Sequence, residues 1–198
     1  MAAENRIMIQ LFHPLIHQSR VNRRLAQAVT GIEGVTVRHM YEIYPDFFID
    51  VGREQDLLLE HDLIVWQHPF YWYSCPSLLK EWIDLVLEHG FAYGSEGRSL
   101  EGKRVLTSIT TGGRKEAYDP DGRNRYSIRQ LLAPFEQTTL LCRMEYLPPF
   151  VVHGTHLLNE QDIDQAAEQY HKMILSLRDG LFDRREIASL EYLNDLIT

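Results

Sequence analysis

Residues 62–90 read DLIVWQHPFYWYSCPSLLKEWIDLVLEHG, and they combine the main signals of the fold in one continuous segment. Residues 62–67 are almost continuously apolar, which is typical of a strand that is buried on both faces. From Leu78 onward, apolar residues recur every four positions, which predicts a helix with one buried face that ends near Gly90. Between them stand four consecutive aromatic residues, Phe70–Tyr73. A strand buries alternate residues and a helix about half of them, so neither hides four adjacent rings.

The rest of the chain repeats this alternation of strand and helix. Further strands are predicted at 6–12, 35–40, 104–109 and 145–152, and further helices at 19–31, 53–60, 127–141 and 159–177. Pro134 predicts a kink or a break in one of these helices, and Pro148-Pro149 place the last strand at a sheet edge. The order predicts an α/β fold with a five-stranded parallel sheet, helices on both faces and three layers. We expect a single domain over residues 1–198, with an extra C-terminal helix within 179–198.

Length and composition narrow the class of protein. The chain has 198 residues, a formal net charge of −8 and no stretch close to the ~20 apolar residues that a transmembrane helix needs. The negative charge argues against nucleic acid as a partner, because phosphate binding depends on Lys and Arg. The two cysteines imply no disulfide framework, and without a signal-like N-terminus we expect a cytoplasmic protein. The histidines lack a compact metal-ligand spacing, so no metal site is predicted.

Three loops come after predicted strands, at the sheet edge where ligands bind in parallel α/β folds. They span residues 13–22, 69–74 and 110–118. The aromatic residues of the second loop can flank a flat ring system, although a corner of the core or a dimer contact would also use them. Gly112 and Gly113 let the backbone of the third loop approach a ligand closely, although two glycines also suit an ordinary turn.

The first loop has the features of a phosphate site. It ends on a helix N-terminus with Ser19 as its N-cap, and free backbone N–H groups there favour an anion. Asn22 can add a hydrogen bond and His13 or Arg20 a charge, whereas the plainer interpretation is a capping serine and a surface histidine. Neither GxGxxG nor GxxxxGK[ST] is present. Together the three loops predict a phosphate-bearing planar heterocycle such as FMN, and a nucleotide would also fit.

Several stretches have a distinctive sequence: HPLIHQSRVNRRL (13–25), YPDFFID (44–50), WQHPFYWYSCPSLLKEWID (66–84), GFAYG (90–94), ITTGG (109–113) and CRMEYLPPF (142–150). In them the chain resembles the flavodoxin-like NAD(P)H:quinone oxidoreductase family, and most of all the ancillary flavoprotein subunits of bacterial glutathione-regulated potassium-efflux systems. The resemblance implies a flavodoxin-like fold, a homodimer, FMN or FAD held without a covalent bond, NADPH or NADH as electron donor, and a quinone substrate. It also implies binding to a membrane potassium antiporter, which would hold the cytoplasmic protein at the inner face of the cell membrane.

The resemblance also implies roles for individual residues. Cofactor-binding segments are matched by His13, Ser19, Arg20, Val21 and Asn22 at the phosphate, by Phe70, Tyr71, Trp72 and Tyr73 along the ribityl chain and ring, and by Thr110, Thr111, Gly112 and Gly113 at the polar edge of the ring. Trp72 and Tyr73 are expected nearest the isoalloxazine. Tyr118 matches a catalytic tyrosine beside the flavin in eukaryotic quinone reductases. Those enzymes carry a histidine further on, where Asn124 of this chain cannot titrate near neutral pH.

The resemblance implies two possible functions. The first is an FMN-dependent NAD(P)H:quinone oxidoreductase that transfers two electrons and also regulates a potassium-efflux antiporter. The alternative is a mainly non-catalytic regulatory subunit of the antiporter. A one-electron flavodoxin carrier is disfavoured, because such carriers have a different phosphate loop that is rich in Ser and Thr.

Overall fold

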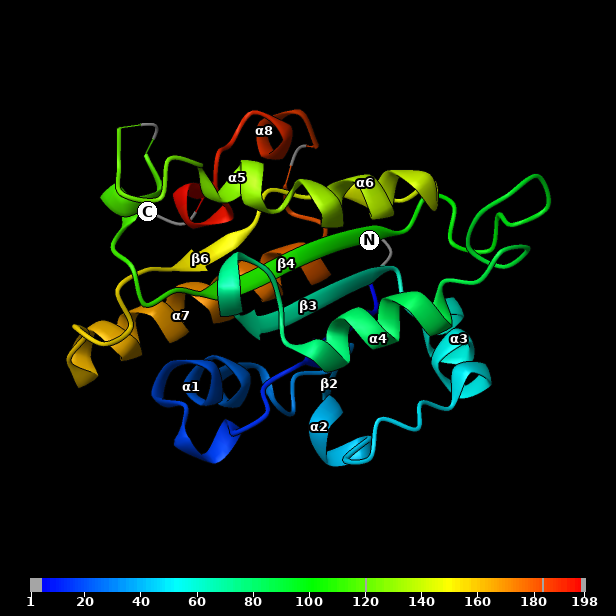
Figure 1. Cartoon of the computed structure of the whole chain (residues 1–198), viewed down its shortest axis with the longest axis horizontal. Coiled ribbons are helices and arrows are strands. Elements are labelled where there is room, and N and C mark those ends of the chain that lie inside the picture. The colour runs from blue at the N-terminus through cyan, green and yellow to red at the C-terminus, as the bar shows by residue number, and fades with distance from the viewer. Residues whose placement is uncertain (1–4, 120, 183, 197–198) are drawn as a thin grey trace.

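A parallel β-sheet forms the centre of the molecule (Figure 1). The computed structural model describes residues 5–119, 121–182 and 184–196. The strands are β1 (Ile7–Leu11), β2 (Val35–His39), β3 (Leu63–Pro69), β4 (Arg104–Thr110), β5 (Glu145–Tyr146) and β6 (Phe150–Val152). They lie in the order β2-β1-β3-β4-β5, with β6 also beside β4, and all these pairs are parallel. The predicted parallel sheet is confirmed.

The fifth predicted strand is divided in two. Pro148 and Pro149 separate β5 from β6, because proline has no backbone N–H group to donate to a neighbouring strand. Both pieces pair with β4, β5 near its start and β6 near its end. They therefore occupy one position in the sheet, at its edge, as the two prolines predict.

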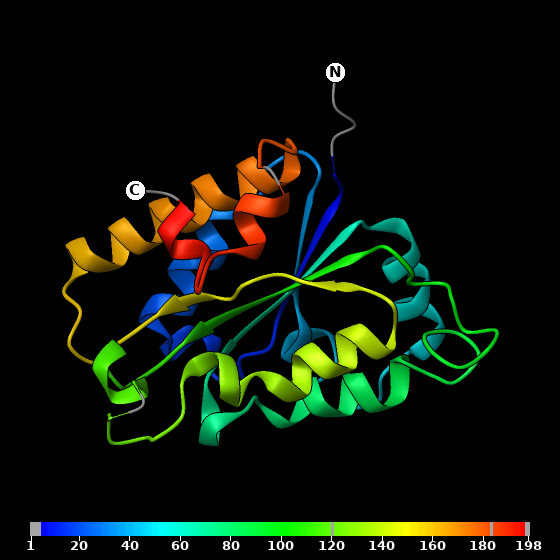
Figure 2. The ribbon, with the colours of Figure 1, turned by 90° about the horizontal axis from the view of Figure 1, so that it is seen from above.

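Helices cover both faces of the sheet and complete three layers (Figure 2). On one face lie α1 (Arg20–Val29) and α7 (Glu160–Arg178), and on the other lie α3 (Val51–Glu60), α4 (Ser77–Val86), α5 (Ile128–Leu131) and α6 (Ala133–Leu141). Shorter elements are α2 (Met40–Ile43), α8 (Arg184–Ala188) and the 3-10 turns η1 (Ile16–Gln18), η2 (Tyr71–Tyr73), η3 (Lys115–Tyr118) and η4 (Leu193–Leu196). The predicted break at Pro134 is confirmed, because α5 ends just before it and α6 begins with this proline in its first turn. Within the described ranges, none of the helices combines the length and the apolar character that crossing a membrane requires.

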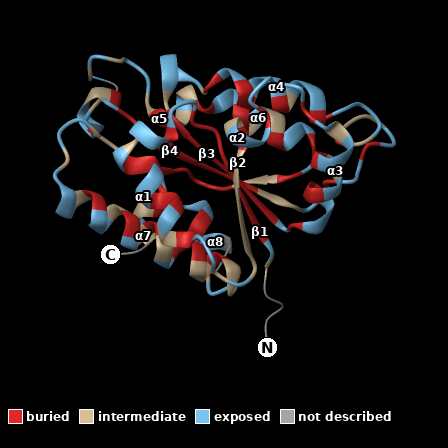
Figure 3. Ribbon diagram, turned by 90° about the horizontal axis from the view of Figure 1, so that it is seen from below, coloured by how far each residue is buried: buried red, intermediate tan, exposed pale blue. Residues whose placement is uncertain are grey.

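Each central strand sends alternate side chains into two hydrophobic cores. Met8 and Ile64 pack toward α3, α4 and α6, where Trp82 is fully buried. Ile9 and Val65 pack on the opposite side, toward α1 and α7. Figure 3 shows the central strands β1, β3 and β4 as a buried layer between helices whose outer faces are exposed. This double burial explains why β3 is apolar along most of its length.

The C-terminal segment packs against the sheet of its own chain. An extra helix is expected within residues 179–198, and α8 and η4 lie in that range. Residues 183, 197 and 198 lie outside the described residues. Asn194 Oδ1 accepts from the Val151 N–H at 2.8 Å, and Asn194 Nδ2 donates to the Val151 carbonyl at 3.0 Å. One side chain thus satisfies both backbone groups of an edge-strand residue.

Candidate functional site

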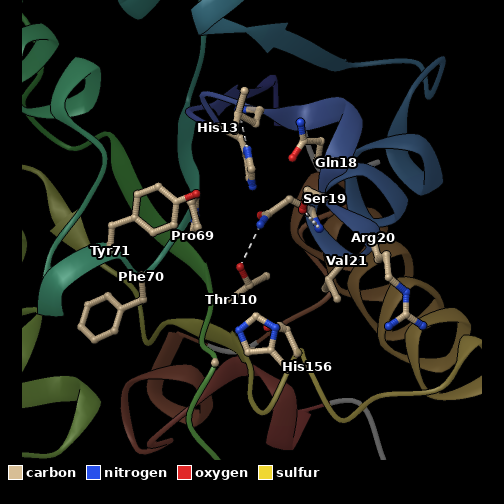
Figure 4. A pocket seen from close by; sticks show the side chains of 14 residues that line it. His13, Gln18, Ser19, Arg20, Val21, Pro69, Phe70, Tyr71, Thr110 and His156 are labelled. Atoms are coloured by element: carbon tan, nitrogen blue, oxygen red, sulfur yellow. Dashed lines mark hydrogen bonds between the residues drawn. The ribbon is translucent and has the colours of Figure 1, made fainter.

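A cavity of about 520 Å³ opens at the C-terminal ends of β1, β3 and β4 (Figure 4). Of the residues predicted to bind a cofactor, it is lined by His13, Ser19, Arg20, Val21, Asn22, Phe70, Tyr71, Thr110 and Gly112. Those that do not line it are Trp72, Tyr73, Thr111 and Gly113. The wall is completed by Leu15, Gln18, Pro69, Thr155 and His156. The three loops that the sequence singles out therefore meet around one cavity.

The N-terminus of α1 forms one side of the cavity. Ser19 caps this helix as predicted, since its Oγ accepts from the backbone N–H of Asn22 at 3.2 Å. The N–H groups of Arg20 and Val21 belong to the first turn, where they have no partner within the helix and carry the positive end of its dipole. The Arg20 side chain pairs with Glu160, with an Nη2–Oε1 distance of 2.6 Å. The backbone, rather than this paired guanidinium, makes the place attractive to an anion.

His13 contributes an imidazole with a defined tautomer. The Leu15 N–H donates to His13 Nδ1 at 3.1 Å, so Nδ1 is unprotonated and the proton of the neutral ring lies on Nε2. Burial lowers the pKa of His13 below its ordinary value, which keeps the ring neutral at neutral pH. The ring meets Tyr71 edge to face, with centroids 6.3 Å apart. In Figure 4 it points into the cavity, where Nε2–H is available as a donor.

Asn22 ties α1 to the sheet and brings an unsatisfied acceptor to the cavity. This residue is 1% exposed, and its Nδ2 donates to Thr110 Oγ1 at 2.8 Å. Gln67 Nε2 donates to the Asn22 carbonyl at 3.0 Å, which fixes the helix against β3. Asn22 Oδ1 is buried and has no hydrogen-bond partner among the described residues. Buried acceptors are normally paired, and this unpaired oxygen belongs to a residue that lines the cavity.

The four adjacent aromatic residues have different surroundings. Phe70 and Tyr71 line the cavity at the end of β3. Trp72 and Tyr73 then adopt left-handed backbone conformations, with φ of 50° and 61°. Trp72 is 92% exposed, and the Tyr73 hydroxyl donates to Asn124 Oδ1 at 3.4 Å. The expectation that Trp72 and Tyr73 lie nearest the isoalloxazine stays a prediction.

The loop after β4 presents Gly112 to the cavity and places Thr111 behind it. A Cβ atom on Gly112 would lie 3.1 Å from ring atoms of His156, which lines the same cavity. Thr111 is 1% exposed, and its Oγ1 donates to the Gly113 carbonyl at 2.8 Å. The absence of a side chain at Gly112 therefore lets a ligand approach the backbone closely.

Tyr118 lies behind this loop and does not line the cavity. It is 7% exposed, and its ring stands beside those of Phe70 and His153, with centroids 6.2 and 5.7 Å away. A Cβ atom on Gly113 would lie 3.1 Å from Tyr118 Cε2. Burial raises the pKa of the phenol, so it stays protonated at neutral pH. A catalytic role for Tyr118 stays a prediction.

The loop after β6 also belongs to the cavity, although it is not among the three loops predicted from the sequence. Thr155 and His156 line the cavity, and the Thr155 N–H donates to the Thr111 carbonyl at 3.0 Å. Because β6 runs parallel to β4, its C-terminal end lies at the same edge of the sheet. The rule that places ligands at the ends of parallel strands, applied to the last strand as well, would have found both residues.

A family model described as flavodoxin-like fold matches residues 5–174. The chain belongs to the flavodoxin-like family. Its strand order, β2-β1-β3-β4-β5, is the flavodoxin-like order, in which the switch point lies between β1 and β3. The fold class expected from the sequence is confirmed.

Relatives of this flavodoxin-like chain carry several names. The glutathione-regulated potassium-efflux system ancillary protein KefG of Pectobacterium carotovorum is 46% identical over 89% of this chain and 96% of its own length. General stress protein 14 of Treponema denticola, solved in complex with FMN, is 39% identical with a TM-score of 0.82, covering 89% of this chain and 99% of that chain. An NADPH-quinone reductase of P. pentosaceus is 30% identical with a TM-score of 0.77, covering 84% and 96%. A protein described as a thermophilic tryptophan halogenase of Streptomycin violaceusniger is 42% identical with a TM-score of 0.83, covering 85% and 98%. Flavodoxin-like chains similar to this one are thus named for different activities.

Proposed function

We propose that this chain binds FMN in the cavity and acts as an NAD(P)H:quinone oxidoreductase, which passes two electrons from NADPH or NADH to a quinone. The observation that carries the proposal is the buried, unpaired Asn22 Oδ1 beside the free N–H groups of α1, at the switch point between β1 and β3. Ligands of sheets with this strand order bind at that switch point. The Treponema relative in complex with FMN and the relative named NADPH-quinone reductase support the cofactor and the reaction.

The residues of the cavity fit each part of FMN. The N–H groups of Arg20 and Val21, with the Nε2–H of His13, would hold the phosphate. Asn22 Oδ1 would accept from a hydroxyl of the ribityl chain. The aromatic wall after β3 would flank the ring, and Gly112 would let the polar edge of the ring reach the backbone. A single helix N-terminus suits the single phosphate of FMN, with FAD as the alternative.

Bound FMN would supply the electron-transfer chemistry that the side chains of the protein lack. The part of this chain is to bind and orient it. Thr111 and Gly113, joined by a hydrogen bond, stabilise the loop that would carry the ring. Trp72 and Tyr73 come directly after Tyr71 and are exposed to solvent. We propose Tyr118 as the catalytic side chain, a protonated hydrogen-bond donor whose pKa is raised by burial.

The proposal extends to partners. The exposed side chains of Tyr71, Trp72 and Tyr73 support a homodimer, because large apolar side chains that cluster on a surface mark interaction sites. The KefG relative supports a second role as ancillary regulator of a membrane potassium-efflux antiporter. The protein would work in the cytoplasm, at the inner face of the cell membrane while an antiporter is bound.

Purification followed by absorption spectroscopy tests the cofactor. We expect a flavin band and, after release from the protein, the mass of FMN. Steady-state oxidation of NADPH and of NADH with a water-soluble quinone tests the reaction. A protein that takes up no FMN on reconstitution would overturn both the cofactor and the reaction.

A mainly regulatory, non-catalytic subunit of the antiporter is the second candidate, and the name of the KefG relative favours it. Potassium efflux from cells that carry a variant without reductase activity separates the two. If that variant still controls potassium efflux normally, the protein acts as a regulator alone. If efflux control is lost together with reductase activity, the two roles are coupled.

A further inference from the structure

The C-terminal tail, residues 184–196, lies outside the region 5–174 that the family model matches. It is attached firmly to the edge of the sheet. Leu193 is fully buried, and its N–H donates to the Pro149 carbonyl at 3.0 Å. Asn194 adds the two hydrogen bonds to β6 described above. This attachment fixes the position of the residue just before them, Tyr192.

Tyr192 connects the tail to the residues behind the loop that contains Gly112. It is 5% exposed, and its ring faces that of His153 with centroids 6.0 Å apart and planes at 78°. Lys115 Nζ lies over the Tyr192 ring, 5.3 Å from its centroid. The ring of Tyr118 meets His153 as well, at 5.7 Å. The orientation of the His153 imidazole is therefore set by two rings, one of which belongs to the tail.

His153 in turn contacts the loop through Thr111. Thr111 Oγ1 donates its proton to the Gly113 carbonyl at 2.8 Å, so toward His153 Nδ1, 3.2 Å away, this oxygen acts as an acceptor. The His153 proton then lies on Nδ1. From Tyr192 the contacts thus run through His153 and Thr111 to the carbonyl beside Gly112, which lines the cavity.

The His153 imidazole depends on the Tyr192 ring to keep this orientation. His153 Nε2 is buried and has no hydrogen-bond partner among the described residues. An imidazole with an unpaired buried nitrogen gains a hydrogen bond to water if it can rotate outward. The Tyr192 ring packs against this imidazole, with centroids 6.0 Å apart, so its removal would leave His153 freer to rotate away from Thr111.

We propose that Tyr192 is a positioning residue that, through His153 and Thr111, holds the Gly112 loop in the conformation that receives the flavin. The inference rests on the proposed function and adds the C-terminal tail to the FMN site. The physical reason is preorganisation, because a loop already held in its bound conformation loses less freedom when its ligand arrives.

Two variants of Tyr192 test the proposal. In the absence of FMN, Tyr192→Ala should show faster hydrogen–deuterium exchange by mass spectrometry in peptides that cover residues 110–118. Exchange in residues 35–43, at the opposite edge of the sheet, should not change. FMN titrated into Tyr192→Ala should bind about tenfold more weakly than to the wild type. Tyr192→Phe, which keeps the ring, should match the wild type in both measurements.

The outcomes separate this inference from the proposed function. Wild-type FMN affinity together with unchanged exchange at 110–118 in Tyr192→Ala would overturn the inference and leave the cofactor assignment intact. Faster exchange at 35–43 as well would show a purely global effect of Tyr192 and would also overturn it. If the wild-type protein binds no FMN, the proposed function is overturned. The proposed role of Tyr192 in flavin binding is then overturned as well. If circular dichroism shows that Tyr192→Ala does not fold, Tyr192→Leu, which keeps apolar bulk without the flat ring, replaces it.

Discussion

Asn22 on α1 and Thr110 at the end of β4 are joined by a hydrogen bond of 2.8 Å, while the other end of the Asn22 amide, Oδ1, is buried in the cavity wall without a partner among the described residues. The bond connects the helix that offers its N-terminus to an anion with the strand that leads into the glycine loop. It also orients the amide, because Nδ2 is committed to Thr110 and Oδ1 is left for a ligand.

Asn22→Ala should weaken FMN binding about tenfold, because it removes the acceptor for a ligand hydroxyl. Thr110→Val should reduce the affinity by less than about threefold, since it removes the hydrogen bond that orients the amide but keeps the acceptor itself. Fluorescence titration of FMN measures both dissociation constants. Equal losses in the two variants would mean that Oδ1 does not contact the cofactor.

Gly112→Ala should weaken FMN binding about tenfold or more, because the new methyl group would press on the His156 ring at 3.1 Å and both residues line the cavity. Adding His156→Ala should restore part of the affinity by making room for that methyl group. Gly52→Ala in α3 is the matched control, since the nearest atom to its Cβ would be 3.8 Å away. It should leave FMN binding unchanged and raise the free energy of unfolding by about 0.5 kcal/mol. Calorimetric titration showing wild-type affinity in Gly112→Ala would remove Gly112 from the cofactor site.

Tyr118→Phe should lower kcat for quinone reduction by about a hundredfold and leave the FMN dissociation constant unchanged, because it removes the hydroxyl and keeps the packed ring. Burial raises the pKa of the Tyr118 phenol above its ordinary value, so the phenol is protonated throughout the neutral range. Between pH 6 and about pH 9, kcat of the wild-type enzyme should therefore not fall because of deprotonation of Tyr118. A variant with wild-type kcat would show that the hydroxyl has no catalytic role.

Acid should destabilise the protein through His68. This side chain is fully buried, and burial lowers its pKa to about 4. In the unfolded chain the imidazole takes up a proton near its ordinary pKa of about 6.5, so below that pH the unfolded state binds more protons than the folded state. Between pH 7 and pH 5, His68 alone should reduce the free energy of unfolding by about 2 kcal/mol.

Urea denaturation at pH 7 and pH 5 measures this contribution. His68→Gln should lose less stability between the two pH values than the wild type does. His17→Gln is the control, because the His17 side chain is 88% exposed, and it should follow the wild type. The same pH dependence in His68→Gln and in the wild type would exclude His68 as its source.

Trp72→Ser should weaken dimer formation at least about tenfold, because a large aromatic side chain exposed beside the cavity is the expected anchor of an interface. Phe48→Ser is the matched control, since Phe48 is 84% exposed and lies between α2 and α3. Size-exclusion chromatography with light scattering over a range of concentrations gives the dissociation constants. A wild-type protein that is monomeric throughout would contradict the proposed homodimer.

Local patterns were sufficient to predict much of the fold. The apolar run at 62–67 becomes β3, and Ser19 caps α1 as predicted. Pro148-Pro149 mark the edge of the sheet and divide its last strand. Each of these features leaves a local signal in the sequence: an apolar run for a buried strand, a capping residue before a helix, or prolines that cannot donate a backbone hydrogen bond. Such signals can be read from a few adjacent residues.

The details of the site depend on contacts that no local pattern contains. Trp72 and Tyr73 take left-handed conformations that residues with side chains seldom adopt, so the sequence did not show which rings would face the cavity. His153 meets Tyr192 only because the tail returns to β6. The loop after β6 belongs to the cavity through the sheet order, and its own composition gave no sign of this.

The side chain of Asn194 imitates a peptide group, since it offers one acceptor and one donor to Val151 as an added strand would. At this residue the rim of the sheet is closed to a strand from another molecule, which is the usual first step of edge-to-edge aggregation. A chain that lost its last residues would expose that rim as a template for pairing with another strand.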